Sequence, residues 1–188
     1  MTSQNHKTFV YVGIGGEHPL AAAAEPNSLG EGGLFRRGDD EEAWQPLTDG
    51  LPADPQVRAM AIHPENPQVL FAGTQDGVYR TSDRGEHWEA TDSPKAEVWS
   101  IVFHPTKPIL YFTNEQDSSI SAYTLNTQNG TLKPFQKISN LPESFSGNNS
   151  CAQIQITKNA KFLFAPNRGH NSIASFSIAQ DDGKLSLI

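Results

Sequence analysis

The side chains that could do chemistry lie in two short polar runs, Asn114-Glu115 and Asn167-Arg168-Gly169-His170. Each run follows a stretch rich in apolar residues, and the two asparagines stand in matching positions 53 residues apart. A carboxylate can take a proton from water, and a guanidinium can bind an anion or a developing oxyanion. Structural interpretations compete with this one. Glu115 could cap a turn or pair with a lysine, and Arg168 and His170 could be a strand-end ion-pair partner and a turn histidine.

The single cysteine, Cys151, precedes an alternating apolar pattern at Ala152, Ile154 and Ile156. This pattern favours a buried core position over a nucleophile, because no base stands beside the thiol. One cysteine cannot form an intramolecular disulfide. No cluster of His, Cys or Asp has metal-ligand spacing, so we expect neither a metal nor another cofactor.

A third polar motif is the octapeptide Thr81-Ser-Asp-Arg-Gly-Glu-His-Trp88. Its spacing predicts a tight turn at Asp83 and Gly85, with the carboxylate accepting backbone N–H groups and Trp88 packed beneath. A degenerate copy surrounds Trp44, where Gly38-Asp-Asp-Glu-Glu replaces the turn. We interpret this motif as structural rather than catalytic.

The elements that carry these residues recur along the chain. The segment Val57–Gly73 matches Val98–Asn114, which places His63 and His104 in equivalent positions 41 residues apart, and a third copy spans Ile154–Asn167. Several short strands at a period of about 40–50 residues are typical of β-propeller blades.

The sequence therefore predicts an all-β fold of about four blades, at residues 9–47, 57–92, 98–138 and 151–188. The stretch Glu17–Gly32 is interpreted as a loop inserted in the first blade. Each blade buries its faces against its neighbours, so an open array leaves an apolar face at either end. We expect a partial propeller, or one that a second copy of the chain completes as a homo-oligomer.

Charge and composition limit the kinds of partner that this protein is expected to bind. The net charge of −7 is uneven, with −9 on residues 1–105 and +2 on residues 106–188, and no basic cluster is present. Nucleic-acid binding is therefore not expected. No stretch approaches the roughly 20 apolar residues that a membrane span needs, so no membrane partner is expected. The N-terminus lacks the pattern of a signal peptide, which makes the cytoplasm the expected location.

Two family resemblances follow from these motifs. Thr81–Trp88 resembles the Asp-box, or BNR repeat, of sialidase-like and sortilin-like propellers, with His87 in place of the usual threonine. The resemblance covers residues 8–100 and implies structural roles for Thr81, Asp83, Gly85 and Trp88. An arginine triad with a Tyr/Glu pair, which a sialidase also needs, cannot be assembled from this sequence.

Residues 103–188 resemble the seven-bladed lactonase family, which includes 6-phosphogluconolactonase and carboxymuconate lactonising enzymes. The resemblance rests on three segments: His104–Glu115, Ser119–Leu125 and Asn167–Ile173. It implies catalytic roles for Glu115, Arg168 and His170. Two further family residues are absent, because Trp99 and Ser100 stand where the family has an arginine and a histidine.

Together the resemblances predict two domains, Asp-box-type blades over residues 1–102 and lactonase-type blades over residues 103–188, joined near His104-Pro105. They also leave the activity open. The chain could hydrolyse a sugar-acid lactone such as 6-phosphogluconolactone, with the incomplete residue set impairing turnover. Alternatively it could be a non-catalytic binding or scaffold module, or a recombinant chimera of two propeller families.

Overall fold

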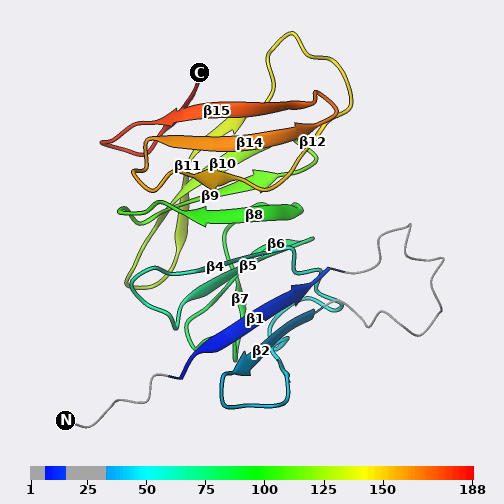
Figure 1. Ribbon diagram of the computed structural model, residues 1–188, viewed down its shortest axis with the longest axis vertical. Coiled ribbons are helices and arrows are strands. Elements are labelled where there is room, and N and C mark those ends of the chain that lie inside the picture. The colour runs from blue at the N-terminus through cyan, green and yellow to red at the C-terminus, as the bar shows by residue number, and fades with distance from the viewer. Residues whose placement is uncertain (1–6, 16–32) are drawn as a thin grey trace, which may run out of the picture.

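The computed structural model describes residues 7–15 and 33–188, which form 16 strands in four antiparallel sheets and no helix. The sheets follow one another in chain order along the long axis of the molecule (Figure 1). This confirms the predicted all-β architecture of about four propeller blades. The predicted loop Glu17–Gly32 lies outside the described residues. In the described part of the chain no helix is long and apolar enough to cross a membrane.

Each sheet is one blade, and in the first three blades the strands pair in sequence order. The first blade holds β1 (Phe9–Ile14), β2 (Gly33–Gly38) and β3 (Gln45–Pro46), and the second holds β4 (Ala59–Ile62), β5 (Leu70–Thr74), β6 (Gly77–Thr81) and β7 (Glu89–Ala90). The third holds β8 (Val98–Phe103), β9 (Ile109–Asn114), β10 (Ser119–Leu125) and β11 (Leu132–Ser139). The fourth holds β12 (Ser150–Cys151), β13 (Gln155–Ile156), β14 (Phe162–Arg168), β15 (Ser172–Ile178) and β16 (Leu185–Leu187), with β12 and β13 both paired to β14.

Apolar side chains fill the space between neighbouring blades. Strand β9 illustrates the principle, because alternate side chains of a strand point to opposite faces. Leu110 and Phe112 pack toward the second blade, whereas Ile109 and Tyr111 pack toward the fourth. All six residues of β9 are consequently buried. A third cluster, which includes Leu34 and Trp88, joins the first blade to the second.

Two kinds of local hydrogen bond occur at equivalent positions in more than one blade. Asn114, at the end of β9, donates to the hydroxyl of Ser119 at 3.0 Å, and Asn167 near the end of β14 donates to that of Ser172 at 3.3 Å. In the blade turns, His104 Nδ1 accepts the amide of Thr106 at 3.2 Å, and His63 makes the same kind of bond. The repeats seen in the sequence thus reuse the same local hydrogen bonds.

The turn after β6 is held by its own side chains. The Thr81 hydroxyl donates to Asp83 at 2.6 Å and accepts the Gly85 amide at 3.0 Å, while Asp83 accepts the amide of His87 at 3.0 Å. Gly85 has a φ of 94°, which glycine adopts without a steric penalty. Trp88 is 1% exposed and packs in the core between the first two blades. These contacts give the motif a structural place in the blade.

The degenerate copy in the first blade is built differently. Trp44 is 41% exposed, and the Arg37 guanidinium lies 5.0 Å from the centre of its ring. The amide of Gly38 donates to the Glu41 carboxylate at 2.8 Å, and Lys7 pairs with the same carboxylate. A glutamate therefore takes the acceptor role in this turn, and its tryptophan is not part of the core.

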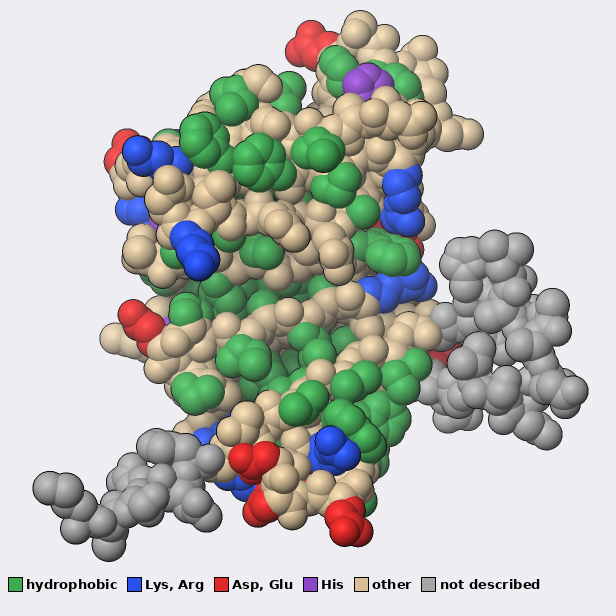
Figure 2. Space-filling view, in the orientation of Figure 1, with side chains coloured by type: hydrophobic (Ala, Val, Ile, Leu, Met, Phe, Trp, Pro, Cys, Tyr) green, Lys and Arg blue, Asp and Glu red, His purple; other side chains and the backbone are tan. Residues whose placement is uncertain are grey.

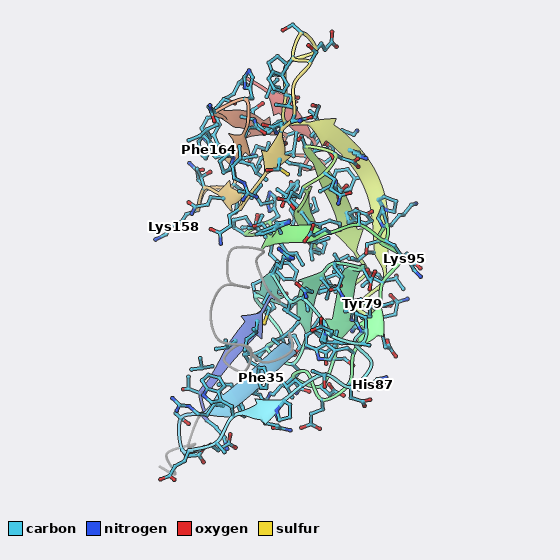
Figure 3. The ribbon with its side chains drawn as sticks, turned by 90° about the vertical axis from the view of Figure 1, so that its right-hand side faces the viewer. Phe35, Tyr79, His87, Lys95, Lys158 and Phe164 are labelled. Atoms are coloured by element: carbon cyan, nitrogen blue, oxygen red, sulfur yellow. The ribbon has the colours of Figure 1, made fainter. Side chains whose placement is uncertain are left out.

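The outer faces of the two end blades expose apolar side chains. Figure 2 shows hydrophobic side chains gathered over the fourth blade and along β1. On β1 the exposed residues are Val10, Val12 and Ile14, and on β14 and β15 they include Phe164 and Ile173. Viewed from the side, Phe164 lies at the opposite edge of the molecule from His87 in the Thr81–Trp88 turn (Figure 3).

We predict that Asp83→Ala lowers the free energy of unfolding by about 1 kcal/mol at pH 7, a modest value because the carboxylate is exposed. Burial by itself would raise the pKa of Asp83, but the Thr81 hydroxyl and the amides of His87 and Glu86 hold it below its usual range. The stabilisation is therefore present above the ordinary aspartate pKa of about 3.9 and disappears as the pH falls through the lower folded value.

Urea unfolding at pH 7 and pH 3 measures this dependence, with Asp92→Ala, an exposed aspartate of the same region, as the matched control. An equal loss for Asp83→Ala at both pH values would contradict the assignment of the stabilisation to the ionised carboxylate.

Candidate functional site

Charged side chains from three neighbouring blades meet at one end of the sheets. In an antiparallel blade, the start of the first strand and the end of the second lie at the same edge. Arg58 directly precedes β4, Glu97 directly precedes β8, Glu115 directly follows β9 and Arg168 is the last residue of β14. Trp99, the second residue of β8, lies among them.

Glu115 and Arg168, which the sequence singles out, form an ion pair between the third and fourth blades. Arg168 Nη2 lies 2.9 Å from Glu115 Oε1 and also donates to the carbonyl of Cys151 at 3.3 Å. The Glu115 side chain is 16% exposed and that of Arg168 is 53% exposed. The carboxylate is therefore largely removed from water, while the guanidinium can still reach a ligand.

His170, the third predicted residue, belongs to a different group of contacts. Its Nδ1 lies 2.7 Å from the Ser172 hydroxyl, and its backbone amide donates to the Asn149 side chain at 3.0 Å. Its ring packs edge-on against Phe145, with the ring centres 4.8 Å apart. The structure thus joins Glu115 to Arg168 but turns His170 toward the loop between β11 and β12.

Two guanidinium groups lie against the indole ring of Trp99. Arg58 lies 4.4 Å and Arg168 5.2 Å from the centre of its indole ring, which is the geometry of cation–π contacts. A pocket of about 380 Å³ opens beside this group and is lined by Arg58, Trp99, Ala152, Gln153, Pro166 and Arg168. Two cations and an aromatic surface suit a small anionic ligand.

Sequence reasoning missed Arg58 and Glu97 as members of this site. Arg58 Nη2 pairs with Glu97 Oε1 at 2.9 Å, so a second ion pair lies beside Trp99. The signal for Arg58 was present in the repeats, since Arg58 and Trp99 follow the matching valines Val57 and Val98. Arg58 thus stacks on its own counterpart from the next blade.

The environment of Glu115 alters its proton affinity. Burial and the neighbouring Glu97 carboxyl raise the pKa of Glu115, while the Arg168 guanidinium acts in the opposite direction. The indole N–H of Trp99 also favours the ionised form, although it lies outside hydrogen-bond geometry. A carboxylate whose pKa is raised is a better base near neutral pH. Among residues 7–15 and 33–188, no three His, Cys, Asp or Glu side chains are grouped to hold a metal ion.

Comparison with known proteins gives a partial match to one family. Residues 100–188 match the family model described as "Lactonase, 7-bladed beta-propeller". A 6-phosphogluconolactonase of Bacillus subtilis is 32% identical over 114 residues, covering 61% of this chain and 31% of the relative. That of Klebsiella pneumoniae is 27% identical over 161 residues, covering 76% of this chain and 48% of the relative.

Solved structures agree on the fold. The periplasmic gluconolactonase of Pseudomonas aeruginosa superposes with a TM-score of 0.69 at 18% identity, covering 96% of this chain and 53% of that one. The chain spans about half or less of the length of these relatives.

The alignment with the Klebsiella protein bears on the predicted two-family join. It covers 76% of the chain, more than residues 103–188 can supply, so the similarity to lactonases extends into the first half. No comparison supports a separate Asp-box family for residues 8–100. The two-family origin accordingly stays a prediction.

We predict that Cys151 of the folded protein reacts at least about 10²-fold more slowly with a thiol reagent than free cysteine at pH 7.4. Burial raises the pKa of its thiol to about 11, and the Sγ atom lies 3.2 Å from the Asn114 carbonyl oxygen that it faces. The rate of colour release with Ellman's reagent, measured with and without urea, tests this. Stoichiometric labelling of the native protein within minutes would show that the thiol is accessible.

Proposed function

We propose, from the premise that residues 100–188 belong to a lactonase-type propeller, that this chain hydrolyses a sugar-acid lactone such as 6-phosphogluconolactone. The Glu115–Arg168 pair, 2.9 Å apart at the edge of the pocket, is the observation that carries the proposal. It combines a largely buried carboxylate with an accessible guanidinium in a group where Arg58 adds a second cation.

The chemistry follows from these groups. Glu115 takes a proton from water as the water oxygen bonds to the lactone carbonyl carbon, and Arg168 stabilises the oxyanion that forms. Breaking the ring C–O bond releases an alkoxide, which receives the proton from Glu115. The product is an open-chain hydroxy acid that loses its carboxyl proton to solvent. Arg58 is placed to attract a phosphate or carboxylate substituent of the substrate.

A second candidate is a non-catalytic module that binds an anionic sugar acid. The observation in its favour is that each guanidinium of the site already pairs with a carboxylate, Arg58 with Glu97 and Arg168 with Glu115. His170, with its contacts to Ser172 and Phe145, is outside this arrangement. Saturable binding without turnover would favour the module.

Three further proposals concern the origin, the location and the assembly of the protein. The first is the boundary that separates residues 1–102 from 103–188, with a different family or a chimera as the origin of the first part. The second is a cytoplasmic location, for which the single cysteine is the argument. The third is closure of the propeller by a second copy, for which the apolar end faces at Val12 and Phe164 provide the support.

We predict that the purified chain opens 6-phosphogluconolactone faster than buffer, as followed by proton release. Glu115→Gln lowers kcat/KM by about 10²-fold or more, because the general base is lost. Arg168→Met lowers kcat by about 10²-fold, because the oxyanion loses its partner. Lys158→Gln, at the opposite end of β14 from Arg168, is the control and retains the full rate.

A rate equal to that in buffer would overturn the hydrolase proposal. If the chain turns over the lactone and Arg168→Met has no effect, hydrolysis takes place at another site.

We also predict a mass of two chains by multi-angle light scattering at micromolar concentration, since two four-blade arrays can close head to tail. Phe164→Ser, on the exposed face of the fourth blade, shifts the mass toward one chain. Ile62→Ser replaces a more exposed apolar residue, which lies in the second blade, and leaves the mass unchanged. A single-chain mass at every concentration would refute closure by a second copy.

A further inference from the structure

Glu97 and Glu115 are cross-strand neighbours at the end of the β8–β9 pair. The antiparallel pairing sets Val98 opposite Asn114, so the residue before Val98 and the residue after Asn114 come next to each other. Their side chains are only 20% and 16% exposed. Directly opposed like charges destabilise a sheet, and removal from water increases the cost.

Each carboxylate has its own guanidinium. Arg58 bonds Glu97 from the second blade, and Arg168 bonds Glu115 from the fourth, both at 2.9 Å. The two guanidiniums also share the ring of Trp99. The carboxyl pair is thus flanked by one cation from each neighbouring blade, an arrangement that keeps both acids in place whether or not one of them carries a proton.

We propose that Glu97 and Glu115 hold a single proton between them, with Glu97 as the positioning residue that sets how tightly Glu115 binds it and Arg58 acting through Glu97. Neither Arg58 nor Glu97 lies in the segment 100–188 that matches the lactonase model. The role of this proton in catalysis rests on the proposed function, but the sharing itself does not.

The charges around Glu115 determine the direction of each effect. Burial and the Glu97 charge raise its pKa, and the Arg168 guanidinium lowers it. The Cys151 thiol lies 4.0 Å from the backbone carbonyl oxygen of Glu115, and its pKa of about 11 keeps it neutral. Removing the charge of Glu97 must therefore lower the pKa of Glu115. Removing Arg58 leaves Glu97 uncompensated and must raise it.

The test is a pH titration of the full chain by ¹³C NMR of the glutamate side-chain carboxyls, with Glu115 assigned by comparison with Glu115→Gln. Glu97→Gln lowers the Glu115 midpoint by about one pH unit, and Arg58→Met moves it upward. Glu143→Gln, an exposed glutamate of the loop between β11 and β12, is the matched control and causes no change. Opposite shifts in two neighbouring variants cannot come from a general loosening of the site.

The wild-type protein provides a measurement that needs no variant to fold. Two carboxyls that share a proton titrate in two macroscopic steps, and the signals of both residues report both steps. Independent single-step titrations of Glu97 and Glu115 in the wild type would overturn the proposal. So would a Glu115 midpoint that stays in place or rises in Glu97→Gln.

The titration also separates this inference from the lactonase proposal. If no lactone is hydrolysed but the two-step titration and the opposite shifts are found, the shared proton stands and the hydrolase proposal fails. If the lactone is hydrolysed while Glu97 and Glu115 titrate independently in the wild type, the hydrolase proposal stands and the shared proton fails.

Discussion

Face-to-face packing of neighbouring sheets is the constraint on which the rest of this structure depends. A four-stranded antiparallel sheet has no enclosed interior of its own, so its apolar side chains must be covered by the next sheet. Strand β9 is buried on both faces for this reason, with Phe112 toward the second blade and Tyr111 toward the fourth. The packing fixes the distance between blades, and that distance lets Arg58 bond to Glu97 and Arg168 bond to Glu115.

Much of this fold could be predicted from the sequence because the repeats are local. The spacing of His63 and His104, and of Asn114 and Asn167, gave four blades at nearly the observed positions. Turn chemistry was readable for a similar reason, since Asp83 bonds groups within four residues of itself. The exception is Trp44, whose local pattern resembles that of Trp88 although it lies exposed beside Arg37.

Only part of the site could be predicted from the sequence, because its contacts connect different blades. Glu115 and Arg168 were found through a resemblance, and the structure joins them. Arg58 and Glu97 were missed, since nothing in a single blade shows that the residue before β4 reaches a tryptophan of the next blade. His170 lies two residues from Arg168 but beyond the strand end, where the chain turns away toward Phe145. Proximity along the chain is a poor guide once a strand has ended.

The paired asparagines have a consequence for how such a site can diversify. Asn114 and Asn167 hold their strand ends through uncharged amide–hydroxyl bonds to Ser119 and Ser172. The residue after Asn114 is negatively charged, whereas the residue after Asn167 is positively charged. These bonds do not involve the residue that follows the asparagine. Repeated blades can therefore keep the same strand end while the next residue varies. In this protein the next residue is Glu115 in the third blade and Arg168 in the fourth. Two equivalent positions of neighbouring blades thus carry opposite charges and form an ion pair.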